Sequence, residues 1–362
     1  MSTSPAENSP AKGPHGSTVW RSGWMMSLGR FLALAVVFAF FAVAVEGGKF
    51  YSSRNLENIA RQSAVYAVAA LGMTMVIIAG GIDLSAGSMI ALAAVASAWV
   101  LNLQTPMPTN EGGGQSIYLV DEWPRLVPIL AVTAAVLAGT LAGLVNGLLI
   151  VGLRLVPFIV TLGTMLVFRG LAKGIARDRD IYPPDDSWIF TILDPTITSP
   201  DASRRSMIVP PGVWMVIVAA IVAGLLLRYT RLGRHIFAIG SNEQTARLCG
   251  VPVEWTKLVV YMLAGFFSGL AAILLFADIR IGQPTAAVAY ELSIIAAVVI
   301  GGGSLMGGEG SILGSIIGAL MITILYMGGK QMGWEQWVQD AAIGAIIIAA
   351  VTLDRVRHRS TQ

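Results

Sequence analysis

The feature that most constrains this chain is a succession of ten apolar segments, most of them close to the length of a membrane-spanning helix. A bilayer core about 30 Å thick requires roughly 20 apolar residues per helix. In chain order the segments are Leu28–Val45, Ala60–Gly80, Gly87–Leu103, Leu126–Val151, Pro157–Ile175, Val213–Arg228, Leu258–Phe276, Glu291–Gly301, Ile312–Met327 and Trp337–Leu353. They predict an all-α polytopic membrane protein with about ten transmembrane helices. The eighth segment is short for a perpendicular crossing, so eight or nine spans remain an alternative.

Composition supports a membrane protein. Hydrophobic residues make up 55% of the 362 residues and charged residues only 12%, whereas a typical soluble domain carries about 25% charged residues. So few charges cannot cover a water-facing surface, and the apolar residues must face lipid or other helices. The net charge of +3 does not supply the concentrated basic face of a nucleic-acid-binding protein. The single cysteine, Cys249, excludes an internal disulfide, and three dispersed histidines do not indicate a metal site.

Basic residues predict which side of the membrane each loop faces, because cytoplasmic loops are enriched in Lys and Arg. Segment 229–257 is rich in arginine and is expected in the cytoplasm, together with both termini. The loops at 104–124 and 176–212 are richer in acidic residues and are expected outside. The chain then divides into a disordered cytoplasmic tail at residues 1–27, a transmembrane domain at residues 28–353 and a basic cytoplasmic tail at residues 354–362.

The polar stretch at residues 231–251 predicts a short helix between two spans. Ser241 or Asn242 can cap its N-terminus, Gly250 can end it in the left-handed conformation, and Pro252 prevents its extension. Two interpretations stay open: a docking surface for a soluble motor, or a solvated loop anchored by positive charge.

The chain lacks the G-x-x-x-x-G-K-[ST] loop that holds nucleotide phosphates. If ATP drives this protein, a partner must bind it.

Acidic residues in or beside the predicted spans are candidates for function, because a charge inside a membrane costs roughly 2.5–3.5 kcal/mol on insertion scales. Asp83 precedes Ser85, and we expect its carboxylate to cap the following helix; a gating or pathway role is the alternative. Glu291 and Asp340 lie near predicted span starts, where they can reach water or a helix N-terminus. Asn146 lies deep in the fourth segment and is expected to link helices rather than to bind a cargo.

Two Gly- and Ser-rich breaks, Gly80–Ser88 and Gly301–Ser311, each follow an apolar segment. They echo each other loosely, as matching breaks do in transporters with internal repeats. Irregular backbone at membrane depth must be buried in protein or line a cavity. The second break is therefore expected against the pathway or a partner subunit, with a plain cytoplasmic turn as the alternative.

Several sequence blocks together give the chain a family resemblance. The blocks are Ala70–Ile77, Gly80–Ser85, Val156–Met165, Arg169–Ala172, Arg231–Val251 and Val299–Gly308. In this order they resemble the permease subunit of bacterial ATP-binding-cassette (ABC) importers of the ribose, xylose and galactose type. The resemblance runs from about Asn55 to Val351. It implies a type II-like importer permease in the bacterial inner membrane, with no catalytic residue of its own.

The resemblance also implies a set of partners. Two permease subunits, identical or paralogous, form the pathway, and cytoplasmic ATPase subunits hold a coupling helix in each of them. ATP and magnesium then belong to the ATPase, and this chain holds no cofactor. A soluble extracytoplasmic binding protein delivers the sugar.

Two groups of residues follow from these matches. The residues expected to contact the ATPase are Arg234, Asn242, Ala246, Arg247, Leu248 and Gly250. The family-motif and pathway candidates are Gly81, Asp83, Ser85, Pro157, Thr161, Gly302, Gly303, Gly307 and Gly308. The family's coupling helix follows a Glu-Ala-Ala-x-x-x-Gly pattern, and this chain keeps only its third small residue, Ala246, and its glycine, Gly250.

The identity of the cargo stays open at this point. Permeases for nucleosides and for branched-chain amino acids look similar, and an ion-coupled secondary carrier is a further alternative. The aromatic residues Tyr66, Phe158, Phe168 and Phe267 could stack on a sugar ring. Lone aromatic residues in spans more often serve packing, and we expect packing for these four.

Overall fold

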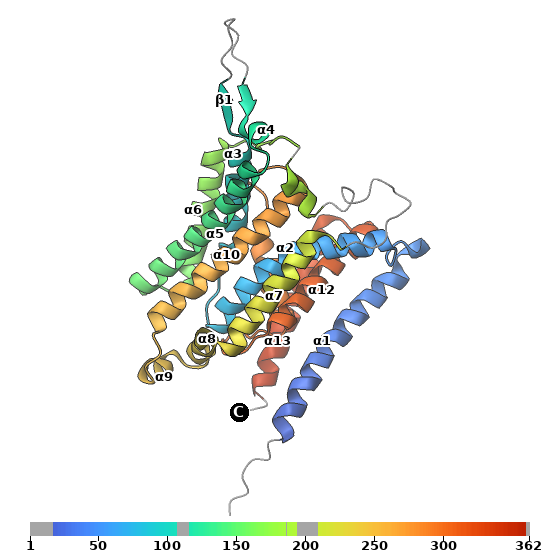
Figure 1. Ribbon diagram of the computed structural model, residues 1–362. Helices are drawn as coiled ribbons and strands as arrows, with labels where there is room; N and C mark the ends of the chain where they lie inside the picture. The colour runs from blue at the N-terminus through green and yellow to red at the C-terminus, as the bar shows by residue number, and fades with distance from the viewer. Residues whose placement is uncertain (1–16, 107–115, 186, 194–208, 360–362) are drawn as a thin grey trace, which may run out of the picture.

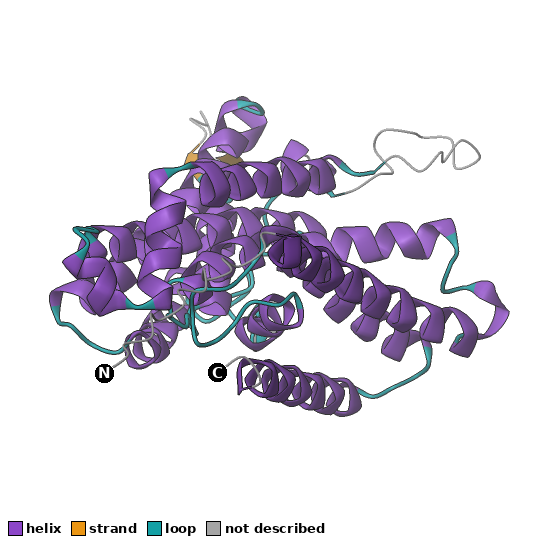
Figure 2. Ribbon diagram, turned by 90° about the horizontal axis from the view of Figure 1, so that it is seen from below, coloured by secondary structure: helices purple, strands orange, loops and turns teal. Residues whose placement is uncertain are grey.

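The computed structural model describes residues 17–106, 116–185, 187–193 and 209–359, and most of these residues are helical (Figure 2). The helices are α1 (Ser17–Ala44), α2 (Ser53–Ile78), α3 (Ala86–Leu101), α4 (Leu119–Glu122), α5 (Leu126–Gly152), α6 (Pro157–Ala176), α7 (Pro211–Tyr229), α8 (Arg231–Ser241), α9 (Glu243–Leu248), α10 (Val253–Ile279), α11 (Tyr290–Ile300), α12 (Ile312–Gln331) and α13 (Gln336–Arg359). Two short 3₁₀ turns, η1 (Glu46–Gly48) and η2 (Trp188–Ile192), and the strands β1 (Gln104–Pro106) and β2 (Ser116–Tyr118) complete the fold.

Six helices are long and apolar enough to cross a membrane: α2, α5, α6, α7, α10 and α12. Shorter apolar helices lie at Leu28–Ala44, Ala86–Leu101, Tyr290–Ile300 and Gln336–Ala349. Each of the ten predicted segments thus corresponds to an apolar helix. The chain is a polytopic helical membrane protein. A count of ten complete crossings stays a prediction, because α11 has 11 residues and at about 1.5 Å per residue reaches only about 16 Å.

The two predicted tails are more ordered than expected. Helix α1 begins at Ser17, so the prediction of disorder is wrong for residues 17–27, and residues 1–16 lie outside the described residues. Helix α13 continues to Arg359, so the predicted basic tail at 354–362 is the last part of a helix, and residues 360–362 lie outside the description. Helix α1 begins before its apolar segment, and α13 ends after its apolar segment. The additional polar residues continue the backbone hydrogen bonds of each helix, which does not require apolar side chains.

The loop at 104–124 departs from the all-α prediction. Strands β1 and β2 pair antiparallel, with Gln104 opposite Tyr118. The predicted loop at 176–212 is also partly structured: η2 buries Ile189 and Phe190, and the Phe190 ring lies 5.4 Å from that of Phe276 on α10.

Helices α2, α12 and α10 are the most buried of the six long helices, with 83%, 72% and 67% of their most apolar stretches buried, against 22% for α7. Helix α5 packs along α10 through small residues. A Cβ atom at Gly143 would lie 2.2 Å from the Tyr261 carbonyl oxygen, and one at Gly265 would lie 2.1 Å from the Gly139 carbonyl oxygen. Small residues four apart let membrane helices approach closely. The exposed faces of α6 and α7 are rich in large apolar residues, as lipid-facing surfaces are.

Figure 1 shows how the ends of the bundle differ. Helices α8 and α9, the start of α1 and the end of α13 lie at one end, which we call the coupling end. The β1–β2 hairpin lies at the opposite end. The segments predicted to be cytoplasmic therefore share one end of the molecule. That this end faces the cytoplasm stays a prediction.

Candidate functional site

Helices α8 and α9 make up the predicted coupling segment, and each begins with a side-chain cap. The Thr230 hydroxyl accepts a hydrogen bond from the Gly233 amide (3.2 Å), and the Asn242 side chain accepts one from the Thr245 amide (2.9 Å). Gly250 has a φ of +80°. The predicted cap at Asn242 and terminator at Gly250 are confirmed. Helix α8 was not predicted, although Thr230 and the buried pair Ile236 and Ile239, one turn apart, are signals that could have indicated it.

Helix α8 is joined to the bundle by backbone contact at Gly240. A Cβ atom at this position would lie 1.7 Å from the Ile78 carbonyl oxygen and 2.5 Å from the Gly308 nitrogen. Ile78 ends α2, and Gly308 lies in the loop between α11 and α12, which we call the glycine loop (residues 301–311). Three segments that are far apart in sequence therefore meet with no side chain between them.

The candidates for ATPase contact do not all share one environment. Arg234, Asn242, Arg247 and Gly250 are exposed, and Leu248 is 89% exposed. Ala246 is 5% exposed and packs with Ile239 and Val253 in a small apolar cluster. Its side chain is thus used for packing within the segment, and the predicted contact of Ala246 with the ATPase stays a prediction. The residue anchors α9, and its small size allows the helix to lie close to the bundle.

Ion pairs orient α9 on the start of α10. Lys257 donates to Glu243 at 2.7 Å, and Arg247 approaches Glu243 at 3.6 Å while also pairing with Glu254. The hydrogen bond with Glu254 raises the pKa of Arg247 above its ordinary value. The Arg247 guanidinium, predicted as a partner contact, is thus engaged within the segment. Exposed ion pairs contribute little to stability. Their role here is to link the short helix α9 to the start of α10.

A hollow of about 540 Å³ lies beside the coupling segment. It separates α9 and the start of α10 from the turn between α5 and α6, and charged residues of both signs line it, among them Arg154, Glu243 and Lys257. Charged groups at such a surface can set which partner binds and how fast it associates.

The break between α2 and α3 carries a buried polar chain of hydrogen bonds. Thr164 donates to the Asn146 side-chain oxygen (2.6 Å), and the Asn146 amide donates to the Ser85 hydroxyl (2.7 Å). The Ser85 hydroxyl and amide both donate to one Asp83 carboxylate oxygen, at 2.6 and 2.8 Å. Asp83, Ser85 and Asn146 are each at most 1% exposed. We call these four residues the buried polar chain.

The buried polar chain confirms one expectation and corrects another. Asn146 joins α5 to the break and to α6, as expected of a residue that links helices. Asp83 was expected to cap α3, but its carboxylate bonds the amide of Ser85, the residue before the helix, and α3 has no side-chain cap. The short Asp83 side chain instead stabilises the turn that precedes the helix.

Thr161 connects the same break to α6. Its hydroxyl donates to the Ile82 carbonyl and accepts from the Leu84 amide, both at 3.1 Å. Pro157 is the first residue of α6, where its missing amide hydrogen costs nothing. The structure therefore brings together four of the motif candidates: Gly81, Asp83, Ser85 and Thr161.

Two buried polar atoms near the break have no hydrogen-bond partner among the described residues: the second Asp83 carboxylate oxygen and the Tyr261 hydroxyl. A Cβ atom at Gly81 would lie 2.5 Å from the Tyr261 oxygen, so Tyr261 lies against the break. Glu291, in the first turn of α11, also has an unpaired carboxylate oxygen. Buried polar groups without a partner are costly to a fold.

The remaining glycine candidates lie in the glycine loop. Gly302, Gly307 and Gly308 have positive φ values of +86°, +86° and +76°. A Cβ atom at Gly307 would lie 3.0 Å from Gly80 Cα, so the two glycine breaks that echo each other in sequence are in contact. The glycine loop packs against α2 and α8 and is more than a plain turn. That it lines a pathway stays a prediction.

Within the described ranges, no group of three or more His, Cys, Asp and Glu side chains could hold a metal ion. The organised features of the chain are instead the coupling segment, the buried polar chain and the glycine loop. Together they connect an exposed helix to the helix breaks inside the bundle.

Comparison with known proteins adds to this geometry. Residues 55–351 match the family described as the permease component of branched-chain amino acid transport systems. The ribose import permease of Escherichia coli (strain K12) is 33% identical over 349 residues, covering 94% of this chain and 97% of that protein. The ribose import permease of Bacillus subtilis (strain 168) is 36% identical over 92% of this chain and 94% of its own. The L-arabinose transport system permease of Escherichia coli (strain K12) is 33% identical over 90% of this chain and 91% of that protein. No solved structure matches the chain.

Proposed function

Because this chain belongs to the family of permease components of branched-chain amino acid transport systems, we propose that it is the transmembrane permease subunit of an ABC importer for a monosaccharide. The observation that carries the proposal is the likeness to ribose and L-arabinose permeases over at least 90% of the chain. Those relatives are named for pentoses, so the proposed cargo is a ribose-like aldose. The proposed location is the bacterial inner membrane.

The sequence lacks a nucleotide-binding loop, which calls for a separate ATPase, and the other proposed partners are those of an importer permease. Separate cytoplasmic ATPase subunits bind ATP and magnesium and dock on the coupling end. A second permease subunit, identical or paralogous, completes the pathway, and an extracytoplasmic binding protein delivers the sugar to the opposite end. The exposed helix α9 and the mixed-charge hollow beside it support the docking surface.

The proposed mechanism is alternating access driven through α8. Closure of the ATPase subunits on ATP displaces α8 and α9 together. Gly240 contacts the end of α2 and the glycine loop with no side chain between them, so a displacement of α8 acts directly on both. Packed interfaces of this kind shift between discrete arrangements rather than deforming continuously. The two helix breaks are then the elements that change arrangement during transport.

The test is ATP-dependent uptake in proteoliposomes that contain this chain, its ATPase and its binding protein. Radiolabelled ribose is the first substrate. The proposal predicts uptake that requires ATP, both partners and a functional ATPase site. Uptake of any substrate by this chain alone, without ATP or partners, contradicts the proposal and supports an ion-coupled carrier.

A branched-chain amino acid is the second candidate cargo, because the family description names that class. The same proteoliposomes distinguish the two candidates. Uptake of leucine without uptake of ribose, arabinose or xylose excludes the sugar assignment while leaving the importer assignment intact.

A further inference from the structure

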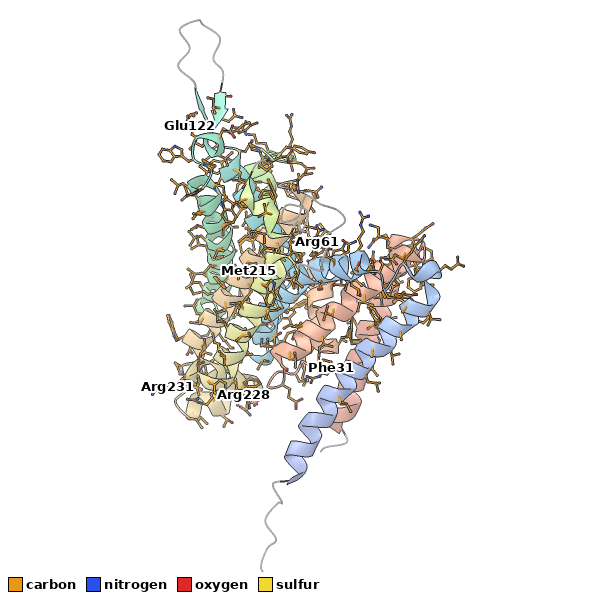
Figure 3. All side chains as sticks on the ribbon, turned by 45° about the vertical axis from the view of Figure 1, so that its right-hand side comes forward. Phe31, Arg61, Glu122, Met215, Arg228 and Arg231 are labelled. Atoms are coloured by element: carbon orange, nitrogen blue, oxygen red, sulfur yellow. The ribbon has the colours of Figure 1, made fainter. Side chains whose placement is uncertain are left out.

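A second hollow, of about 560 Å³, opens at the end of the bundle opposite to the coupling segment. It lies among the first half of α2, the end of α10, the starts of α11 and α13, and the end of α12. Arg61, which borders it on α2, lies well away from Arg228 and Arg231 at the coupling end (Figure 3). In the proposed topology this is the side on which the binding protein delivers the cargo. The volume is within the range of small-molecule sites, about 300–1,000 Å³.

Three tyrosines from three different helices line this hollow, which we call the tyrosine hollow. The Tyr66 ring lies 4.7 Å from the Tyr290 ring and 6.4 Å from the Tyr326 ring, and the Tyr66 and Tyr326 planes differ by only 15°. All three side chains are half-buried, which leaves part of each ring beside open volume. By contrast, Phe168 and Phe267 are buried, 3% and 4% exposed, and serve packing as expected.

Polar side chains with oriented oxygens surround the three rings. Arg61 donates to one oxygen of Asp278 at 2.8 Å, and the Gln336 amide donates to one oxygen of Asp340 at 3.0 Å. Asp340 lines the hollow together with Tyr66 and Tyr326. Each carboxylate is therefore held in place by a neighbour at the edge of the hollow.

This combination matches the chemistry of one class of ligand. A monosaccharide has an apolar face of C–H groups, which stacks on an aromatic ring, and a rim of hydroxyls, which donate to carboxylates and exchange hydrogen bonds with amides. The tyrosine hollow presents rings and acceptors together, as the binding of a monosaccharide requires.

We propose that the tyrosine hollow is a sugar-binding site of the permease itself, in which the C–H face of the monosaccharide stacks on Tyr66 and its hydroxyls bond Asp278 and Asp340. The inference rests on the proposed function and goes beyond it, because it assigns substrate selection in part to this chain rather than to the binding protein alone. The site receives the sugar on release, before the pathway opens towards the coupling end.

The test measures two activities of the full transporter in proteoliposomes: ribose uptake, and ATP hydrolysis stimulated by the binding protein. Tyr66→Leu and Asp340→Asn are expected to lower uptake at least tenfold while stimulated hydrolysis stays within twofold of wild type. Tyr66→Phe keeps the ring and is expected to retain most uptake. Tyr51→Leu removes a 59% exposed tyrosine outside the hollow and serves as the matched control. Uptake within twofold of wild type in both Tyr66→Leu and Asp340→Asn overturns the inference.

A second measurement covers variants that fail to assemble. Cys249 is the single cysteine, so Cys249→Ser gives a background into which Gln62→Cys places one thiol on the lining of the hollow. Ribose is expected to slow maleimide labelling of this thiol at least threefold and to leave a Tyr51→Cys thiol unaffected. Equal labelling rates with and without ribose, at concentrations up to 100-fold above the half-saturating value for uptake, overturn the inference.

The two proposals fail in different ways. If wild-type transporter takes up no sugar, the proposed function is wrong. If wild-type transporter takes up ribose but the variants of the hollow behave as wild type and ribose gives no protection, only the site is wrong.

Discussion

The amide of Gly308 donates a 2.9 Å hydrogen bond to the carbonyl of Ile78, which joins the glycine loop to the last residue of α2. Gly240 of α8 lies against both of these backbones. The contact leaves no space for a side chain at Gly240, as the proposed mechanism requires. It is the structural link between the proposed docking surface and the helix breaks.

Gly240→Val tests this link. The added side chain has to displace the Ile78 carbonyl, and overpacking of this kind costs typically about 1–3 kcal/mol. We expect ATP-driven uptake to fall at least tenfold while the ATPase still co-purifies with the permease. Gly224→Val is the matched control, because a Cβ atom at Gly224 meets no atom within 4 Å. Normal uptake in the Gly240 variant contradicts the proposed transmission.

Leu248→Glu tests the docking surface. Leu248 is 89% exposed at the end of α9, where the proposed ATPase contact would cover it. A buried, unpaired carboxylate in that interface is unfavourable, so we expect loss of ATPase co-purification with normal membrane insertion. Leu248→Met, which preserves the apolar contact, should retain the complex. Full association of the Glu variant places the docking surface elsewhere.

Gly250→Val addresses the end of the same helix. Gly250 has a φ of +80°, which disfavours residues with a Cβ atom. A Cβ atom at this position meets no atom within 4 Å, so the effect of the substitution comes from backbone strain and not from a clash. The variant is expected to misdirect the segment that follows α9 and to abolish ATPase association, with insertion intact. Gly250→Asn tolerates the left-handed conformation better and should associate to a measurable degree. Association of the Val variant at the wild-type level rejects this role for Gly250.

Asn146→Ala tests the buried polar chain. The substitution removes the hydrogen bonds of Asn146 to Ser85 and Thr164, and bonds between membrane helices are worth about 0.6 kcal/mol on average and up to about 1.7. We expect a lower unfolding temperature in detergent, measured on the purified protein. Thr133→Val on the same helix removes only an exposed hydroxyl that bonds Ile129, and should leave that temperature unchanged. Equal stability of both variants means that the chain of bonds does not hold α5 to the break.

Cysteine labelling tests the orientation of the chain. Cys249 is exposed at the coupling end, and a membrane-impermeant maleimide is expected to label it in inside-out vesicles but not in intact cells. In a Cys249→Ser background, Trp123→Cys at the opposite end should show the reverse pattern. Labelling of Cys249 from outside intact cells inverts the topology and removes the basis for ATPase docking there.

The sequence alone located every apolar helix and several of their boundaries. Helices α5, α6 and α12 begin at the predicted residues, Leu126, Pro157 and Ile312. These boundaries were predictable because apolar composition and proline act locally. The cap at Asn242 and the terminator at Gly250 were predictable for the same reason, since each depends on backbone within three or four residues.

Only the tertiary structure determined the contacts between segments that are distant in the sequence. Burial of Ala246, the unpaired oxygen of Asp83, the meeting of Gly240 with Ile78 and Gly308, and the grouping of Tyr66, Tyr290 and Tyr326 around one hollow all join residues from different helices. In a chain whose helices are apolar on most faces, periodicity does not reveal which face meets which neighbour, because lipid and protein interior are equally apolar. The side chains that come together are therefore set by close packing, which a sequence of similar apolar segments does not specify.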